Sequence, residues 1–140
     1  MSVQAVLLPV FAMVALTFVL LFRTAFARRA DLTSGRVQAR DIALGQFAWT
    51  PKTQQYGNSF NNQFQLPVLF YVVMTLALIT RQADLLFVVL AWVFVVLRVA
   101  HAFIHITNNR VMRRGMIFGL GAMVLIAMWV IFAVRILLAA

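Results

Sequence analysis

Three polar residues, Arg98, His101 and His105, interrupt an apolar stretch of the sequence at spacings of three and four. These spacings place all three side chains on one stripe of a helix. An arginine within a membrane helix is costly to expose to lipid, so it should face protein or water. Only three residues of the chain are acidic: Asp31, Asp41 and Asp84. The stripe therefore predicts either a polar cage made by the protein itself or a site for an anion brought by a ligand.

The histidine pair allows three interpretations. His101 and His105 lie four residues apart, so both rings can reach one metal ion, but no third ligand of the Cys, Asp or Glu type is near in the sequence. We therefore expect no metal site. The simplest interpretation is a pair of hydrogen-bonding residues within the bundle, and a small transporter or proton path through the pair is the third.

A cluster of side-chain amides precedes the second apolar segment. Its members are Asn58, Asn61, Asn62 and Gln65. Asn62 and Gln65 share a helical face, and amides in membrane helices usually bond across helices. The sequence predicts a polar pocket between the second and third membrane helices, with interhelical hydrogen bonding that needs no ligand as the alternative.

Composition sets the class of the protein. Of the 140 residues, 64% are hydrophobic, and the mean hydropathy is +0.97, far above the roughly 45–50% apolar content of soluble domains. We expect an all-α integral membrane protein with one domain, residues 1–140, in contact with the lipid bilayer. The net charge of +9 is assigned to topology and anionic lipids, not to nucleic acid. The absence of cysteine excludes disulfides and any thiol of the protein itself.

Four apolar segments are long enough to span a bilayer, which needs about 20 residues. The predicted helices cover residues 3–27, 61–80, 84–107 and 116–139, and short connections make the bundle antiparallel. The long loop 28–60 has room for a short interfacial helix over residues 35–44. Residues 49–57, with their Trp, Pro, Tyr and Gly, predict an irregular stretch at the level of the lipid headgroups.

Charge predicts the orientation. Nine of the twelve basic residues lie in or beside the first and third loops. By the positive-inside rule these loops face the cytoplasm and both termini face outward. We expect location in a bacterial inner membrane.

Two runs of sequence resemble the MAPEG family, the membrane-associated proteins of eicosanoid and glutathione metabolism. Residues 62–71 resemble the start of the family's second helix. Residues 98–101, together with 109–110 and 113–115, resemble the end of its third helix and the turn into the fourth. The resemblance covers nearly the whole chain. It implies a homotrimer of four-helix subunits that binds glutathione between neighbouring subunits on the cytoplasmic side.

The resemblance also implies roles for particular residues. Asn62 matches an asparagine of the family pattern, Gln65 replaces a glutamate and Asn58 replaces an arginine. His101 and His105 stand where the family often has tyrosines. The resemblance implies that Arg113 or Arg114 stabilises the thiolate of bound glutathione. It also implies that Arg23, Arg28 or Arg29 corresponds to the basic residues that end the family's first helix.

Two functions follow as expectations. In the first, Arg98, Asn62 and Gln65 hold glutathione, and the protein acts as a glutathione transferase or peroxidase on lipophilic electrophiles. Replacement of the glutamate by Gln65 removes a charge-assisted bond to the ligand's amino group, a loss of about 1.5–3 kcal/mol. In the second, the protein keeps the fold without catalysis, as a structural subunit, a lipid-binding protein or an accessory of a larger membrane complex.

Overall fold

The computed structural model describes residues 1–45 and 48–138, and within them the chain forms helices and no strand. The elements are α1 (Val3–Thr33), α2 (Ala39–Ile42), α3 (Pro51–Asn61), the 3₁₀ turn η1 (Asn62–Phe64), α4 (Leu66–Ile79), α5 (Leu85–Ile106) and α6 (Val111–Leu138). Four spans are long and apolar enough to cross a membrane: α1, α3 to α4 taken together, α5 and α6. The expected all-α membrane protein with four spanning helices is confirmed.

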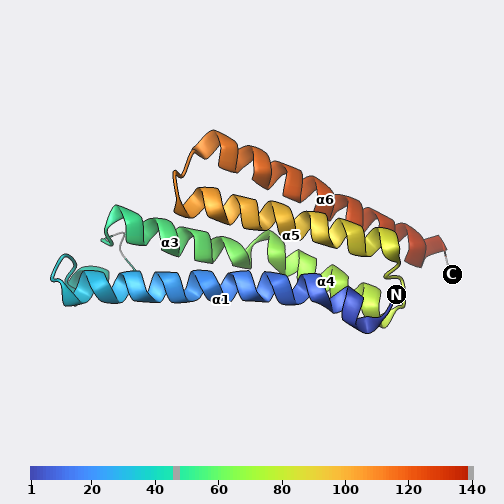
Figure 1. The fold of residues 1–140 in the computed structure, drawn as a ribbon, viewed down its shortest axis with the longest axis horizontal. Helices are drawn as coiled ribbons and strands as arrows, with labels where there is room; N and C mark the ends of the chain where they lie inside the picture. The colour runs from blue at the N-terminus through green and yellow to red at the C-terminus, as the bar shows by residue number, and fades with distance from the viewer. Residues whose placement is uncertain (46–47, 139–140) are drawn as a thin grey trace.

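The helices run alongside one another in alternating directions (Figure 1). α1 lies at one side of the bundle and α6 at the other, with α3, α4 and α5 between them. Both termini lie at one end, whereas the α1–α3 and α5–α6 connections lie at the opposite end, which we name the basic end because it carries Lys52 and most of the arginines.

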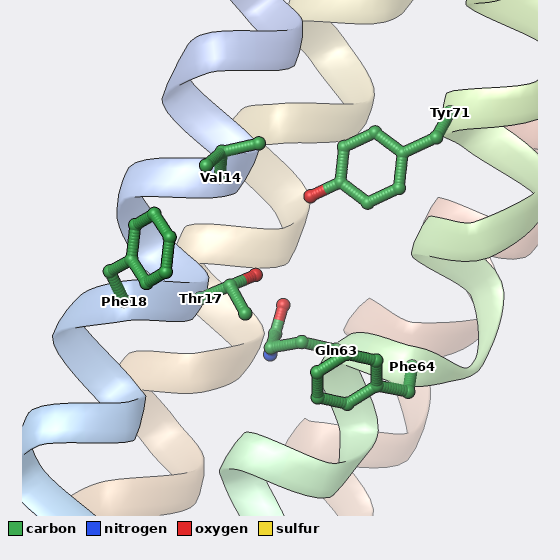
Figure 2. A pocket seen from close by; sticks show the side chains of 6 residues that line it. All are labelled: Val14, Thr17, Phe18, Gln63, Phe64 and Tyr71. Atoms are coloured by element: carbon green, nitrogen blue, oxygen red, sulfur yellow. The ribbon is translucent and has the colours of Figure 1, made fainter.

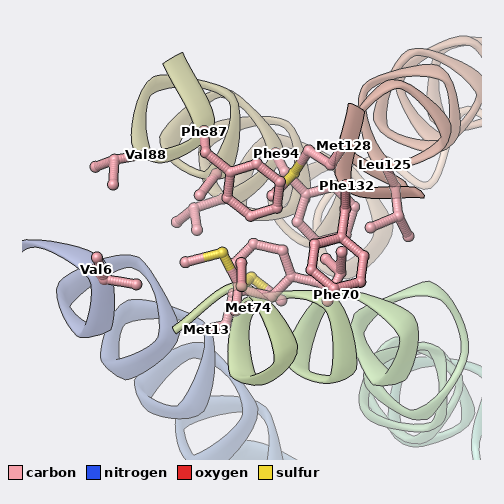
Figure 3. Packing of buried hydrophobic residues seen from close by; sticks show 14 residues of the cluster. Val6, Met13, Phe70, Met74, Phe87, Val88, Phe94, Leu125, Met128 and Phe132 are labelled. Atoms are coloured by element: carbon pink, nitrogen blue, oxygen red, sulfur yellow. The ribbon is translucent and has the colours of Figure 1, made fainter. Parts of the chain in front are cut away.

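The core lies in the half of the bundle nearer the termini, and Figure 3 shows its side chains between the helices. α4 contributes Phe70, Val73, Met74 and Ala77, all buried and spaced as one helical face. The ring of Phe70 stacks on that of Phe94 from α5, with centroids 4.8 Å apart. Because lipid is as apolar as these side chains, close packing rather than the hydrophobic effect holds the helices together here.

The buried stripe of α5 changes character along its length. Its spacing of four and three is unbroken through six residues: Phe87, Ala91, Phe94, Arg98, His101 and His105. The first three members belong to the apolar core, and the last three carry the polar groups toward the basic end. The predicted common stripe of Arg98 and the two histidines therefore continues the core-facing surface of the helix.

The expectation of an irregular stretch over residues 49–57 is wrong from Pro51 onward, because helix α3 begins there. Thr50 is the N-cap residue and Pro51 opens the helix, where its missing N–H is no loss. The second span thus starts about ten residues earlier than predicted and is interrupted by η1. The interruption precedes Pro67, whose ring would clash with the carbonyl of residue 63 in a continuous helix.

Other boundaries also differ from the expectation. α1 continues to Thr33, and α6 begins at Val111 rather than at residue 116. The extension of α1 carries Asp31, whose buried carboxylate accepts hydrogen bonds from the backbone N–H and the hydroxyl of Thr50, at 3.3 and 2.8 Å. The short helix expected over residues 35–44 is only the single turn α2. The predicted end of the last helix, residue 139, lies outside the described residues.

Candidate functional site

Arg98 is the most deeply buried charged side chain near the basic end, with 1% of its surface exposed. Its Nη2 donates to the side-chain Oδ1 of Asn62 at 2.5 Å and to the backbone carbonyl of Asn62 at 3.2 Å. The sequence predicted a polar pocket between the second and third membrane helices, with interhelical hydrogen bonding as the alternative. The structure contains the hydrogen bonds, and the pocket stays a prediction.

The helix break makes the carbonyl of Asn62 available to Arg98. In a continuous α-helix this oxygen would accept the N–H of the residue four positions later. Here the 3₁₀ turn brings the N–H of Gln65 to it instead, at 3.4 Å. A carbonyl oxygen has a second lone pair, and Arg98 uses it. The carbonyl oxygen of Asn62 at the helix break therefore accepts from both the N–H of Gln65 and the guanidinium of Arg98.

A relay of amides connects Arg98 to the surface. The Nδ2 of Asn62 donates to the Oε1 of Gln65 at 3.0 Å. Exposure rises along the series: Arg98 is buried, Asn62 is half-buried and Gln65 is exposed. We name these three residues the Arg98 relay.

The guanidinium keeps free hydrogen-bonding capacity. Its Nε and Nη1 are buried and have no hydrogen-bond partner, and its Cζ lies 6.0 Å from the ring centroid of Phe118 on α6. Such a cation–π contact compensates a buried charge only in part.

Within residues 1–45 and 48–138, no carboxylate pairs with Arg98, because all three acidic side chains are engaged elsewhere. Asp31 pairs with Arg36, Asp41 with Arg40 and Asp84 with Arg135. Arg98 is thus a buried cation whose neighbours within the chain are neutral acceptors and an aromatic ring.

The two histidines continue the polar surface beside Arg98. His101 and His105 are 3% and 5% exposed, and their ring centroids lie 5.6 Å apart. Neither Nδ1 has a hydrogen-bond partner. Among the described residues, no group of three or more His, Cys, Asp or Glu could hold a metal ion. The pair therefore supplies two buried polar nitrogens next to a cation.

Sequence reasoning missed the residues that tie α3 to the end of α5. The Nε2 of Gln55 donates to the carbonyls of His105 and Thr107 at 2.5 and 3.1 Å, and Lys52 donates to the carbonyl of Ile106. The last carbonyls of a helix lack partners within the helix, so these side chains satisfy them. The signal that could have found them is the pair Thr50–Pro51, which starts a helix that carries Lys52 and Gln55 one turn apart.

The remaining predicted site residues do not all gather at the relay. Arg114, half-buried, donates to the Oδ1 of Asn109 at 2.5 Å and is near enough to interact electrostatically with both histidines. Arg113 is exposed. Arg28 lies on α1, with its Cζ 5.1 Å from the ring of Trp49. Arg114 therefore belongs to the same region as the relay, whereas Arg28 lies against Trp49 and Gly57.

The arrangement suits anion binding better than chemistry by the protein alone. It contains a cation, amide groups and imidazoles, but no cysteine. Any nucleophilic thiol must come from a bound molecule. A guanidinium with unused N–H groups binds carboxylates well, since hydrogen bonds between two charged groups are among the strongest in proteins.

Comparison with known proteins gives one match. One family model, that of the MAPEG family, matches residues 6–134. No curated protein and no solved structure matches the chain.

Proposed function

This chain belongs to the MAPEG family, and we propose on that premise that it binds glutathione at the Arg98 relay. Membership also makes it an integral membrane protein of that family, in agreement with its four spanning helices. In the proposed state three copies form a homotrimer, and each glutathione lies at the boundary between neighbouring copies.

The observation that carries the proposal is the unpaired guanidinium of Arg98. Glutathione has two carboxylates, one ammonium group and one thiol. A carboxylate would accept from Nε or from Nη1, the two nitrogens that lack partners among the described residues. Hydrogen bonds to charged groups are worth about 1.5–3 kcal/mol each, so the ligand would gain affinity by compensating a buried charge.

The other residues take complementary roles. Asn62 and Gln65 bond the peptide and receive its ammonium group on their amide oxygens. His101 and His105 form the polar wall beside it. Arg28 lies against Trp49 and Gly57 rather than at the relay, so its contact with a bound ligand would come from the neighbouring copy in the homotrimer.

The chemistry proposed for this site is attack by the glutathione thiolate on a lipophilic electrophile, as in a transferase or peroxidase. The cations at the start of α6, Arg114 and Arg113, stabilise the thiolate, and Arg114 is the nearer to the histidines. Preorganised cations lower the energy of a developing anion without reorganisation during the reaction.

The test is calorimetric titration of the purified protein in lipid nanodiscs with glutathione. We expect saturable heat, with affinity increased at least about tenfold in Gln65→Glu, because the new carboxylate pairs with the ligand's ammonium group. Asn61→Asp adds the same charge at an exposed neighbouring position and serves as the matched control. No heat at millimolar glutathione, in either the original protein or Gln65→Glu, would refute the proposal.

A second candidate function is structural, and one observation favours it. Arg98 already bonds Asn62 within the chain, and Gln65 lacks the charge that would hold an ammonium group. In that case the protein serves as a subunit of a larger membrane complex or as a lipid-binding protein. Native mass spectrometry after gentle extraction separates the cases, since stable co-purifying proteins support the subunit role and a bare homotrimer opposes it.

The orientation is proposed from charge. The basic end would face the cytoplasm and the termini the outside, in a bacterial inner membrane. Because the chain has no cysteine, single cysteines placed near residues 35 and 82 can be labelled with a membrane-impermeant maleimide in intact cells. Labelling at residue 82 alone supports the orientation, and labelling at residue 35 alone reverses it.

A further inference from the structure

A second site lies on the other side of the helix break, between α1 and the η1–α4 segment. This pocket has a volume of about 270 Å³ and six lining residues: Val14, Thr17, Phe18, Gln63, Phe64 and Tyr71 (Figure 2). Consecutive residues of a 3₁₀ turn point about a third of a turn apart. Asn62 therefore reaches Arg98 on α5, while Gln63 lines the pocket against α1.

The pocket contains a buried acceptor without a partner. Gln63 is 1% exposed, and its Nε2 donates to the carbonyl of Ser59 at 3.1 Å. Its Oε1 has no hydrogen-bond partner. Leaving a buried acceptor unsatisfied is unfavourable, and such groups call for an explanation. A ligand that donates a hydrogen bond to this oxygen would provide one.

Two hydroxyl groups lie beside the amide of Gln63. Thr17 donates its own proton to the carbonyl of Met13 at 3.0 Å and also hydrogen-bonds the side chain of Tyr71, so Gln63 supplies the unpaired acceptor of the pocket. The ring of Tyr71 reaches across the pocket with its hydroxyl directed toward α1 (Figure 2). The polar groups at this position thus favour a ligand that donates a proton over one that only accepts.

The walls are apolar and open toward the outside of the bundle. Phe18 and Phe64 are 53% and 59% exposed and flank the pocket, with Val14 above them in Figure 2. The pocket is smaller than the 300–1,000 Å³ that drug-sized ligands occupy. It therefore fits a small ring or one end of a longer lipophile that arrives from the bilayer.

We propose that this pocket binds a neutral lipophile that carries a hydroxyl group, such as an alkylphenol, with its O–H donated to Gln63 and its apolar body between Phe18 and Phe64. A carboxylate is disfavoured because it has no proton to donate to the unpaired oxygen of Gln63. The pocket uses none of the residues of the Arg98 relay, although its Tyr71 lies near enough to Arg98 to interact with it electrostatically.

The chain has two tyrosines, which allows a direct test by ¹⁹F NMR of protein labelled with 3-fluorotyrosine in nanodiscs. Tyr71 reports on the pocket, and Tyr56, which contacts Arg23 and Lys52 at the basic end, is the internal control. We expect 4-ethylphenol to shift the Tyr71 resonance saturably and to leave that of Tyr56 unchanged. The methyl ether, 4-ethylanisole, should bind about two- to tenfold more weakly, the range expected for one lost hydrogen bond.

Two variants keep the test decisive. Gln63→Leu should lower the affinity for 4-ethylphenol to that for 4-ethylanisole. Val14→Phe should abolish the binding of both by filling the pocket. Val19→Phe makes the same change at an exposed position of α1 outside the pocket and should bind as the original protein does. Equal affinity for phenol and ether, tighter binding of 4-ethylbenzoate, or no saturable shift of Tyr71 would each overturn the proposal. The last result would mean that a side chain of a neighbouring copy or a lipid chain occupies the pocket.

Discussion

The contact between Arg98 and Asn62 can be isolated by a double-mutant cycle. Asn62→Ala removes the Oδ1 that accepts from Nη2 of Arg98 at 2.5 Å. Because this bond joins a neutral acceptor to a buried charge, we expect a loss of about 1.5–3 kcal/mol of unfolding free energy. Asn61→Ala removes an exposed amide one residue earlier and should change stability by less than about 0.5 kcal/mol.

The partner variant, Arg98→Met, has two opposing effects. It removes both hydrogen bonds to Asn62, worth about 3–6 kcal/mol together, but it also removes two buried unsatisfied nitrogens that cost about 1–3 kcal/mol each. These contributions largely cancel, so Arg98→Met should be less destabilising than Asn62→Ala. In the Arg98→Met background, Asn62→Ala should lose most of its effect, which gives a coupling energy of about 1.5–3 kcal/mol.

The assay is reversible unfolding of the purified protein in mixed micelles, followed by far-ultraviolet circular dichroism as the denaturing detergent increases. Independent effects, with a coupling energy near zero, would refute the account of the Asn62 side chain as an acceptor for Arg98. A larger loss from Arg98→Met than from Asn62→Ala would refute the statement that Nε and Nη1 lack partners.

Three further predictions follow from the geometry. Asn62→Asp places a carboxylate beside Arg98 and should stabilise the ligand-free protein by about 1–3 kcal/mol. It should also lower the affinity for glutathione in the calorimetric titration proposed above. Asp84→Asn should cost up to about 1 kcal/mol in unfolding experiments, because it removes the ion pair with Arg135 at 2.6 Å, while asparagine can still cap α5. Since hydrogen bonding to Arg135 lowers the pKa of Asp84 below its usual 3.8, this stabilisation is present above about pH 4 and is lost as the pH falls through the lowered pKa. Gln55→Leu should expose the end of α5 to faster amide hydrogen exchange, because it removes two bonds to the last carbonyls.

Each of these predictions has a matched control. Asn61→Asp controls for added charge, and Asp41→Asn changes an acid in an exposed pair with Arg40 and should leave stability nearly unchanged. Gln54→Leu changes the neighbour of Gln55 that bonds Asn58 on its own helix. An Asn62→Asp protein that is less stable than the original, or an Asp84→Asn protein whose loss persists below pH 2, would contradict the respective prediction.

The sequence predicted the parts of the fold that depend on hydropathy and helical period. The four spans and the shared stripe of Arg98, His101 and His105 needed only those two signals. α3 was missed because residues 52–62 are mostly polar, so no hydropathy window marks them as a membrane helix. Its start depended on a cap signal at Thr50 and Pro51 that we assigned to a loop.

The pairing of Arg98 with Asn62 could be predicted only in part. The amides and the arginine were expected between the same two helices, but the backbone acceptor depends on the 3₁₀ turn, which no periodicity reveals. The free Nε and Nη1, the engagement of all three acids elsewhere and the orphan Oε1 of Gln63 are properties of the packed chain. Residue types and their spacing in the sequence do not predict these properties.

The central claim is that Arg98 compensates its buried charge with a carboxylate of glutathione. The most direct measurement is a pair of density maps of the protein in nanodiscs, without ligand and with millimolar glutathione. The account predicts tripeptide density in the second map, with a carboxylate within hydrogen-bond distance of Nε or Nη1 of Arg98 and its ammonium group toward Gln65. Two identical maps, or a tripeptide bound away from Arg98, would contradict it.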